Sequence, residues 1–482
     1  MPDPTRMNSP ARSLPWLLAI FPFALLLYVV LQYGVPVPYL DEWDLIPLLQ
    51  KMYGGTLALG DIWQLHNEHR LFFPQIIMLG LARLTHWDLR YEMAASVVFA
   101  IGMFLLLAYQ AHVTGRKLAI PALSWAIPLF SVIVFSISQY QNWLWGWQLE
   151  IFLSVLAVLG GIVLLSNPPF TWVRFFGAAL SGVVASYSFG NGGVFWLTGW
   201  LVLWVMLEPG KNRRMRLVLW STLAGLTMGF YFYQYKGVEE HPPLNLLFSE
   251  PVPYLGYVLK YLGNIGAQYS ARNHSMVGTF SLIYGIAGLA ILIWTVMVLR
   301  GSKPVDWRLL VPFFAMILYS LGSAMIIGVG RIGLGADQAG SSRYCTVTAP
   351  FWAALVTILC VLSTKPEIKI KPKSRLPGQA RSPGKPPAYQ EAARWFLGFV
   401  GLLLVSGSVM AVNAASILSR NLEIGRQRLL TIPLQLDASI DYRPLGALHP
   451  RPEVILERFP FLKERRLSIF RDETVPPPQS QP

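Results

Sequence analysis

Charged residues are scarce in this chain, and their scarcity decides its class. Only 13% of the 482 residues are charged, against about 25% in soluble globular proteins. Hydrophobic residues make up 54% of the chain, and its mean hydropathy is +0.46. These values predict an all-α polytopic membrane protein. The net charge of +14 comes from short Lys and Arg clusters between apolar runs. Such clusters set orientation in a bilayer, and they exclude a nucleic-acid partner.

Cysteine is almost absent, and a signal-peptide cleavage site is missing. The two cysteines, Cys345 and Cys360, lie in or beside one apolar run, so no disulfide framework is implied. The first apolar run follows Arg6 and Arg12, as in a signal peptide, but no small-residue cleavage site comes after it. We therefore interpret it as a retained first span.

Apolar runs long enough to cross a membrane predict about eleven transmembrane helices. A further run, 71–84, is short and contains Pro74 and Gln75. If it lies flat on the outer surface, the basic clusters fall on the cytoplasmic side together with the N-terminus, as the positive-inside rule requires. This topology places the C-terminus outside. The expected spans are 14–35, 92–112, 119–137, 148–166, 173–188, 194–208, 216–234, 277–299, 310–329, 346–363 and 395–413.

The topology divides the chain into four parts. Residues 1–364 form a membrane module, whose first outer loop, 36–91, carries two surface helices. Residues 365–394 are a basic cytoplasmic linker rich in Pro, Lys and Gly, typical of a flexible tether facing lipid headgroups. Residues 395–413 are the last transmembrane helix, and 414–482 are a small outer C-terminal tail in which leucines between 429 and 436 suggest a short strand or two.

Three carboxylates lie within four residues at the mouth of the first span, in Tyr39-Leu40-Asp41-Glu42-Trp43-Asp44. Acidic groups held beside a bilayer are costly and indicate a functional site, although a solvated helix cap is the alternative. After them, Leu45, Leu48, Leu49 and Met52 form one apolar helical face that ends at Gly54-Gly55. The loop continues with Gly60-Asp61-Ile62-Trp63 and the polar cluster 66–70.

This order resembles the first periplasmic loop of GT-C type membrane glycosyltransferases that use polyprenyl-phosphate sugars. Protein O-mannosyltransferases and the lipid A aminoarabinose transferase belong to that group. The matching residues are Asp41-Glu42, Gly60-Asp61 with Trp63, and the segment from His66 to Pro74. The chain departs from the family where a Lys-Pro-Pro or His-Pro-Pro segment is replaced by His69-Arg70-Leu71-Phe72-Phe73-Pro74. The resemblance implies a GT-C type helical bundle and covers about the first 170 residues by motif.

It also implies a polyprenyl-phosphate-linked sugar donor, a lipid, glycan or protein acceptor, and roles for individual residues. Asp41 is expected to be the general base, with Glu42 as the second choice for that catalytic role. Fixed positive charge is needed for the leaving phosphate. Arg331 in a glycine-rich loop, and Arg343 beside Tyr344 at the start of a span, fit that need. The alternative for each arginine is snorkelling at a helix end. We expect Arg70, Arg331, Arg343 and Tyr344 to bind the donor phosphate, and Asp44, His66, Glu68, His69 and Asn191 to bind substrate.

Two ligand questions stay open in the sequence. A divalent metal on His66, Glu68 or His69 with Asp41 or Glu42 is not expected, because this spacing is a poor zinc signature. No cofactor is expected. The glycine-rich segment around Asn191 either lets the backbone approach the donor sugar or forms only a tight turn.

Two other function classes remain as alternatives: a lipid-linked glycan polymerase or ligase, and a transporter or flippase of a lipid-linked sugar. A transporter is expected to carry charged or broken segments at mid-membrane, whereas the acidic groups here gather on one side. A polymerase keeps its main catalytic loop late in the chain. The sequence therefore favours a glycosyltransferase in a bacterial inner membrane, with the N-terminus cytoplasmic and the site periplasmic.

Overall fold

The computed structural model describes residues 9–235, 251–266, 274–302, 305–364, 386–433 and 442–471. In these segments every regular element is a helix, as expected. The first half of the chain contains α1 (Ser9–Tyr33), α2 (Ile46–Tyr53), α3 (Leu59–Ile62), α4 (Phe72–Thr85), α5 (Arg90–Leu118), α6 (Ala126–Val134), α7 (Tyr140–Leu144), α8 (Leu149–Ser166), α9 (Trp172–Ser186), α10 (Val194–Met206) and α11 (Lys211–Phe232). The second half contains α13 (Pro251–Gly263), α14 (His274–Ser302), α15 (Val311–Arg331), α16 (Cys345–Ser363), α17 (Ala388–Thr431) and α18 (Pro452–Glu464).

Within the described residues, eight helical segments are long and apolar enough to cross a membrane, so the chain is a multi-pass membrane protein. They coincide with eight of the eleven expected spans. The other three correspond to α9, α10 and α11. The first two have only 15 and 13 residues, and at about 1.5 Å per residue each falls short of a hydrocarbon core about 30 Å thick. The third begins with Lys211, Arg213, Arg214 and Arg216.

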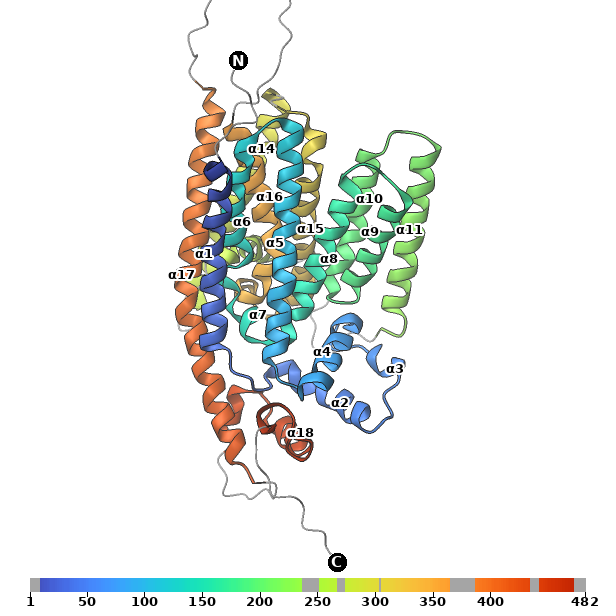
Figure 1. The fold of residues 1–482 in the computed structure, drawn as a ribbon, viewed down its shortest axis with the longest axis vertical. Coiled ribbons are helices and arrows are strands. Elements are labelled where there is room, and N and C mark those ends of the chain that lie inside the picture. The colour runs from blue at the N-terminus through green and yellow to red at the C-terminus, as the bar shows by residue number, and fades with distance from the viewer. Residues whose placement is uncertain are drawn as a thin grey trace, which may run out of the picture.

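The spans form an upright bundle with α16 at its centre (Figure 1). Every residue of α16 from Cys345 to Leu362 is buried, where it packs against α6, α15 and α17. The helices α8 to α11 extend the bundle to one side (Figure 1). The close approach of α10 and α11 depends on Gly199, because a Cβ there would lie 2.3 Å from the Trp220 ring.

The first outer loop lies at one end of the bundle, where α2, α3, α4 and α18 gather (Figure 1). The expected amphipathic helix after the acidic stretch is confirmed as α2, which Gly54 caps. The 71–84 run forms α4, which has 14 residues and lies with α2 and α3 at this end. A second hydrophobic core, separate from that of the bundle, joins Trp43, Leu49 and Trp87 to Leu448 and Phe459.

The C-terminal part differs from expectation. The predicted strands are wrong for residues 429–432, because α17 runs for 44 residues to Thr431. No proline interrupts it before Pro433, and a proline both lacks a backbone donor and restricts the residue before it. Residues 434–441, and residues 365–385 of the expected linker, lie outside the described residues. The rest of that linker is partly helical, since α17 begins at Ala388.

Candidate functional site

A cavity of about 550 Å³ lies at the end of the bundle beside the first outer loop. Its wall is built from the ends of elements that are far apart in sequence, including the start of α8 and the ends of α11 and α15. Eight of the eleven expected site residues line it, namely Asp41, His66, Glu68, His69, Asn191, Arg331, Arg343 and Tyr344. Apolar side chains such as Phe232, Ile326 and Ile327 form another part of the wall. The cavity is therefore amphipathic.

Asp41 lies in a 3₁₀ turn, Leu40–Leu45, directly after the first span. Leu40 has φ +48°, in the left-handed region, which is unfavourable for a leucine. Its N–H donates to the Leu448 carbonyl at 2.8 Å, so the C-terminal segment helps to hold this conformation. Burial raises the pKa of Asp41, and the nearby His66 and Arg343 oppose that rise. A buried carboxylate with cations nearby can accept a proton at a useful pH.

Glu42 points away from the cavity into the protein. It is 2% exposed and accepts hydrogen bonds from the backbone N–H groups of Tyr39 at 2.7 Å and Trp147 at 3.2 Å. Burial, followed by the neighbouring Glu92, raises its pKa well above the usual range. The second choice for a catalytic base thus does not reach the cavity. Its contacts indicate that it fixes the turn that presents Asp41.

Arg70, another expected phosphate ligand, is not among the residues that line the cavity. Its guanidinium donates to the carbonyls of Trp63 at 2.7 Å, Tyr231 at 2.6 Å and Tyr233. The side chain lies over the Trp63 ring, and the residue is 4% exposed. These three carbonyls engage Nε, Nη1 and Nη2, and phosphate binding by Arg70 stays a prediction. Arg70 fastens the first outer loop to the end of α11.

The other three expected phosphate ligands, Arg331, Arg343 and Tyr344, line the cavity, and the two arginines have different partners. Arg331 forms an ion pair with Glu68, whose carboxylate also lies 3.6 Å from His69 Nε2. Arg343 lies 5.8 Å from the centre of the Trp145 ring, and its Nε is 3.5 Å from Ser341 Oγ. Within the described residues it has no carboxylate within 4 Å. Arg343 is therefore the cation better placed to receive an anionic ligand.

One residue on the wall was not foreseen. Glu150, in the first turn of α8, lines the cavity and is 5% exposed. Its Oε2 has no hydrogen-bond partner within the described part of the chain. The sequence offered one signal, an acidic residue at the start of an apolar run, and such residues are functional candidates.

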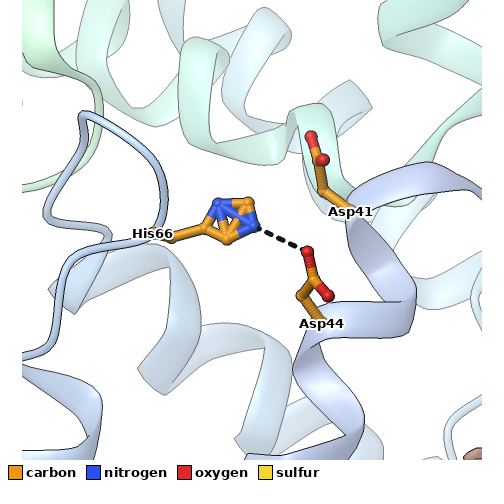
Figure 2. A group of neighbouring side chains, drawn as sticks. All are labelled: Asp41, Asp44 and His66. Atoms are coloured by element: carbon orange, nitrogen blue, oxygen red, sulfur yellow. Dashed lines mark hydrogen bonds and ion pairs between the residues drawn. The ribbon is translucent and has the colours of Figure 1, made fainter. Parts of the chain in front are cut away.

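Asp44 comes from the same turn as Asp41 and also faces His66 (Figure 2), but it does not line this cavity. Its Oδ2 is 3.3 Å from His66 Nε2, and its Oδ1 accepts a hydrogen bond from Arg458 Nη1 at 2.5 Å. Figure 2 shows Asp41, Asp44 and His66 facing one another. Each offers one ligand atom, and these atoms lie within 4.8 Å of one another. The residue types suit a divalent cation, but both oxygens of Asp44 already have partners.

No protein-family model, curated protein or solved structure compared with the chain matches it significantly.

Proposed function

We propose that this protein is an inverting glycosyltransferase that moves a sugar from a polyprenyl-phosphate donor to a hydroxyl or amine acceptor. One observation carries the proposal. Asp41 lies about 300 residues before Arg331 and Arg343 in the chain, and all three line the same amphipathic cavity. A carboxylate facing two guanidiniums beside an apolar wall matches the charges of a phosphate-linked lipid and its acceptor.

The residues have separate roles in this reaction. The acceptor oxygen or nitrogen attacks the anomeric carbon and forms the new glycosidic bond, while the bond from that carbon to the phosphate oxygen breaks. The proton of the acceptor passes to Asp41, whose raised pKa suits a base. The polyprenyl phosphate leaves with the bonding electron pair, and Arg343 and Arg331 stabilise its charge. For Arg331, the phosphate takes the place of the Glu68 carboxylate.

The arrangement of the helices supports a GT-C type bundle with the site on the outer face. The last turn of α5 carries Arg116 and Lys117, and α11 begins with a basic turn. Both of these helix ends lie at the end of the bundle opposite α2 and α4 (Figure 1). By the positive-inside rule, the basic end is cytoplasmic and the cavity faces the periplasm of a bacterial inner membrane. This topology requires α9, α10 and α11 to cross as well, with α9 and α10 shorter than the eight long spans.

Replacing Asp41 by Asn tests the proposal, because an amide keeps the size of the side chain but cannot take the proton. We expect the rate of transfer from a radiolabelled polyprenyl-phosphate hexose to fall by a factor of about 10² to 10⁴, with normal folding. Asp306→Asn is a matched control, because Asp306 is an exposed helix cap and Asn also caps well. Full activity of Asp41→Asn would overturn the assignment. Turnover of pyrophosphate donors alone would favour a glycan polymerase or ligase instead.

A further inference from the structure

A second cavity, of about 340 Å³, lies on the far side of His66. It is formed by the first outer loop alone, from the 3₁₀ turn, α2, α3 and α4. His66 and Asn67 line both this cavity and the larger one, so they form part of the boundary between the two. Its size lies in the range of small-molecule sites and is too small for a folded partner.

The wall of this second cavity is polar and has little net charge. Lys51 Nζ pairs with Asp61 Oδ1 at 2.5 Å, and Asp44 pairs with Arg458, also at 2.5 Å. These pairs compensate the charges, and the amides of Gln64, Asn67 and Gln75 remain as hydrogen-bonding groups. Amide and carboxylate groups recognise hydroxyls, because they combine donors and acceptors in one place. A neutral ligand rich in hydroxyls fits this wall.

Gln75 provides the second observation that points to a ligand. It lies in the first turns of α4, lines the second cavity and is only 6% exposed. Its Oε1 accepts no hydrogen bond within the described residues. A buried acceptor without a donor lowers stability by about 1–3 kcal/mol, and native proteins rarely contain such an acceptor. This oxygen is fully covered in the structure, so a ligand hydroxyl in the cavity supplies the missing donor once the Gln75 amide turns toward it.

The second cavity is also close to the proposed base. Asp44 lines it, Asp41 lines the larger cavity, and ligand atoms of these two residues and His66 lie within 4.8 Å of one another. The His66–Asp44 contact of 3.3 Å is long for a charge-assisted hydrogen bond. A ligand held in the second cavity therefore needs to extend only past this pair to bring a hydroxyl to Asp41.

We infer that the second cavity is the acceptor subsite and that it binds a sugar unit of a glycan or glycolipid. This inference rests on the proposed glycosyltransferase function and names the acceptor class. One acceptor hydroxyl passes the His66–Asp44 pair and gives its proton to Asp41 as its oxygen bonds to the anomeric carbon. Another hydroxyl donates to Gln75 Oε1. The donor remains in the larger cavity, so the two substrates approach Asp41 from opposite sides.

The test measures binding, which requires neither donor nor transfer. Purified full-length protein in detergent is titrated with methyl glycosides of common hexoses, and binding is followed by saturation-transfer NMR of the glycoside. We expect saturable binding by the wild type, and an affinity at least about tenfold lower in Gln75→Leu. Gln64→Leu should weaken binding in the same direction, and because Gln64 is exposed, this variant remains informative if Gln75→Leu fails to fold. Gln50→Leu is the matched control, an exposed glutamine on α2 outside both cavities.

Three outcomes would overturn the inference. The first is that the wild type shows no saturable glycoside binding. The second is that Gln75→Leu and Gln64→Leu both bind the glycoside as tightly as the wild type. The third is that the wild type binds a Ser/Thr-containing peptide and Gln75→Leu abolishes that binding. The proposed function fails by a different measurement, namely the absence of donor turnover that depends on Asp41. Glycoside binding without turnover would retain the subsite and refute the glycosyltransferase.

Discussion

Replacing Arg458 by Ala should loosen the turn that carries Asp41, although Arg458 lies more than 400 residues further along the chain. Arg458 Nη1 donates to the Trp43 carbonyl at 2.8 Å and to Asp44 Oδ1 at 2.5 Å. The Arg458 side chain is 20% exposed and that of Asp44 is 37% exposed. Hydrogen bonds to charged groups are worth about 1.5–3 kcal/mol when well buried, and exposed ion pairs about 0–1 kcal/mol. The exposure of this pair lies between these two cases, so we expect Arg458→Ala to weaken the docking of α18 by about 1–2 kcal/mol. That change raises the population of the undocked α18 segment about 5- to 30-fold.

Hydrogen exchange measured by mass spectrometry on the full-length protein checks this estimate. Amides of residues 40–46 and of α18 should exchange faster by that factor in Arg458→Ala, and the rate of sugar transfer should fall. Arg458→Lys should recover part of both effects, because it restores the charge but not the guanidinium geometry. Arg465→Ala removes the same charge from an exposed position just after α18 and should change neither the amide exchange nor the rate of sugar transfer. Unaltered exchange at residues 40–46 in Arg458→Ala would refute the reasoning.

Three further results are expected. Because Arg343 lowers the pKa of Asp41, Arg343→Gln should raise it. The acidic limb of the pH profile of transfer, where activity is lost as Asp41 becomes protonated, should then move to higher pH; a shift to lower pH would contradict this. Gly146→Ala should destabilise the protein by about 1–3 kcal/mol in thermal unfolding, because the new Cβ would lie 2.7 Å from Glu92 Cβ. Gly60→Ala is the control and should leave the stability unchanged, because a Cβ there meets no atom within 4 Å. Chelation by EDTA should leave transfer unchanged, because both Asp44 oxygens are engaged; inhibition reversed by a divalent cation would show that the Asp41–Asp44–His66 group holds a metal.

Local patterns in the sequence predicted much of this fold. The apolar runs correspond to the eight long helices, and the spacing of leucines before Gly54-Gly55 predicted α2. These features depend on residues close together in the chain, where hydrophobic period and helix stops are informative. The same holds for Asp41, because acidic residues beside an apolar run are conspicuous.

The errors arose where distant segments decide the outcome. Glu150 seemed to belong to an apolar span until the fold brought it to the cavity wall. Likewise, no local pattern reveals that Arg70 donates to the carbonyls of Tyr231 and Tyr233. The strand assignment at 429–432 instead had a local cause, because it followed a run of leucines and overlooked the absence of a helix breaker before Pro433.

The second hydrophobic core has a consequence for the order in which the protein matures. Trp43 and Leu49 leave the ribosome about 400 residues before their partners Leu448, Phe459 and Phe470. Domains generally fold from the N-terminus during synthesis, and here the outer loop stays partly uncovered until those partners have been made. A nascent chain that stops before residue 442 can complete its bundle but lacks the half of this core that closes over the Asp41 turn.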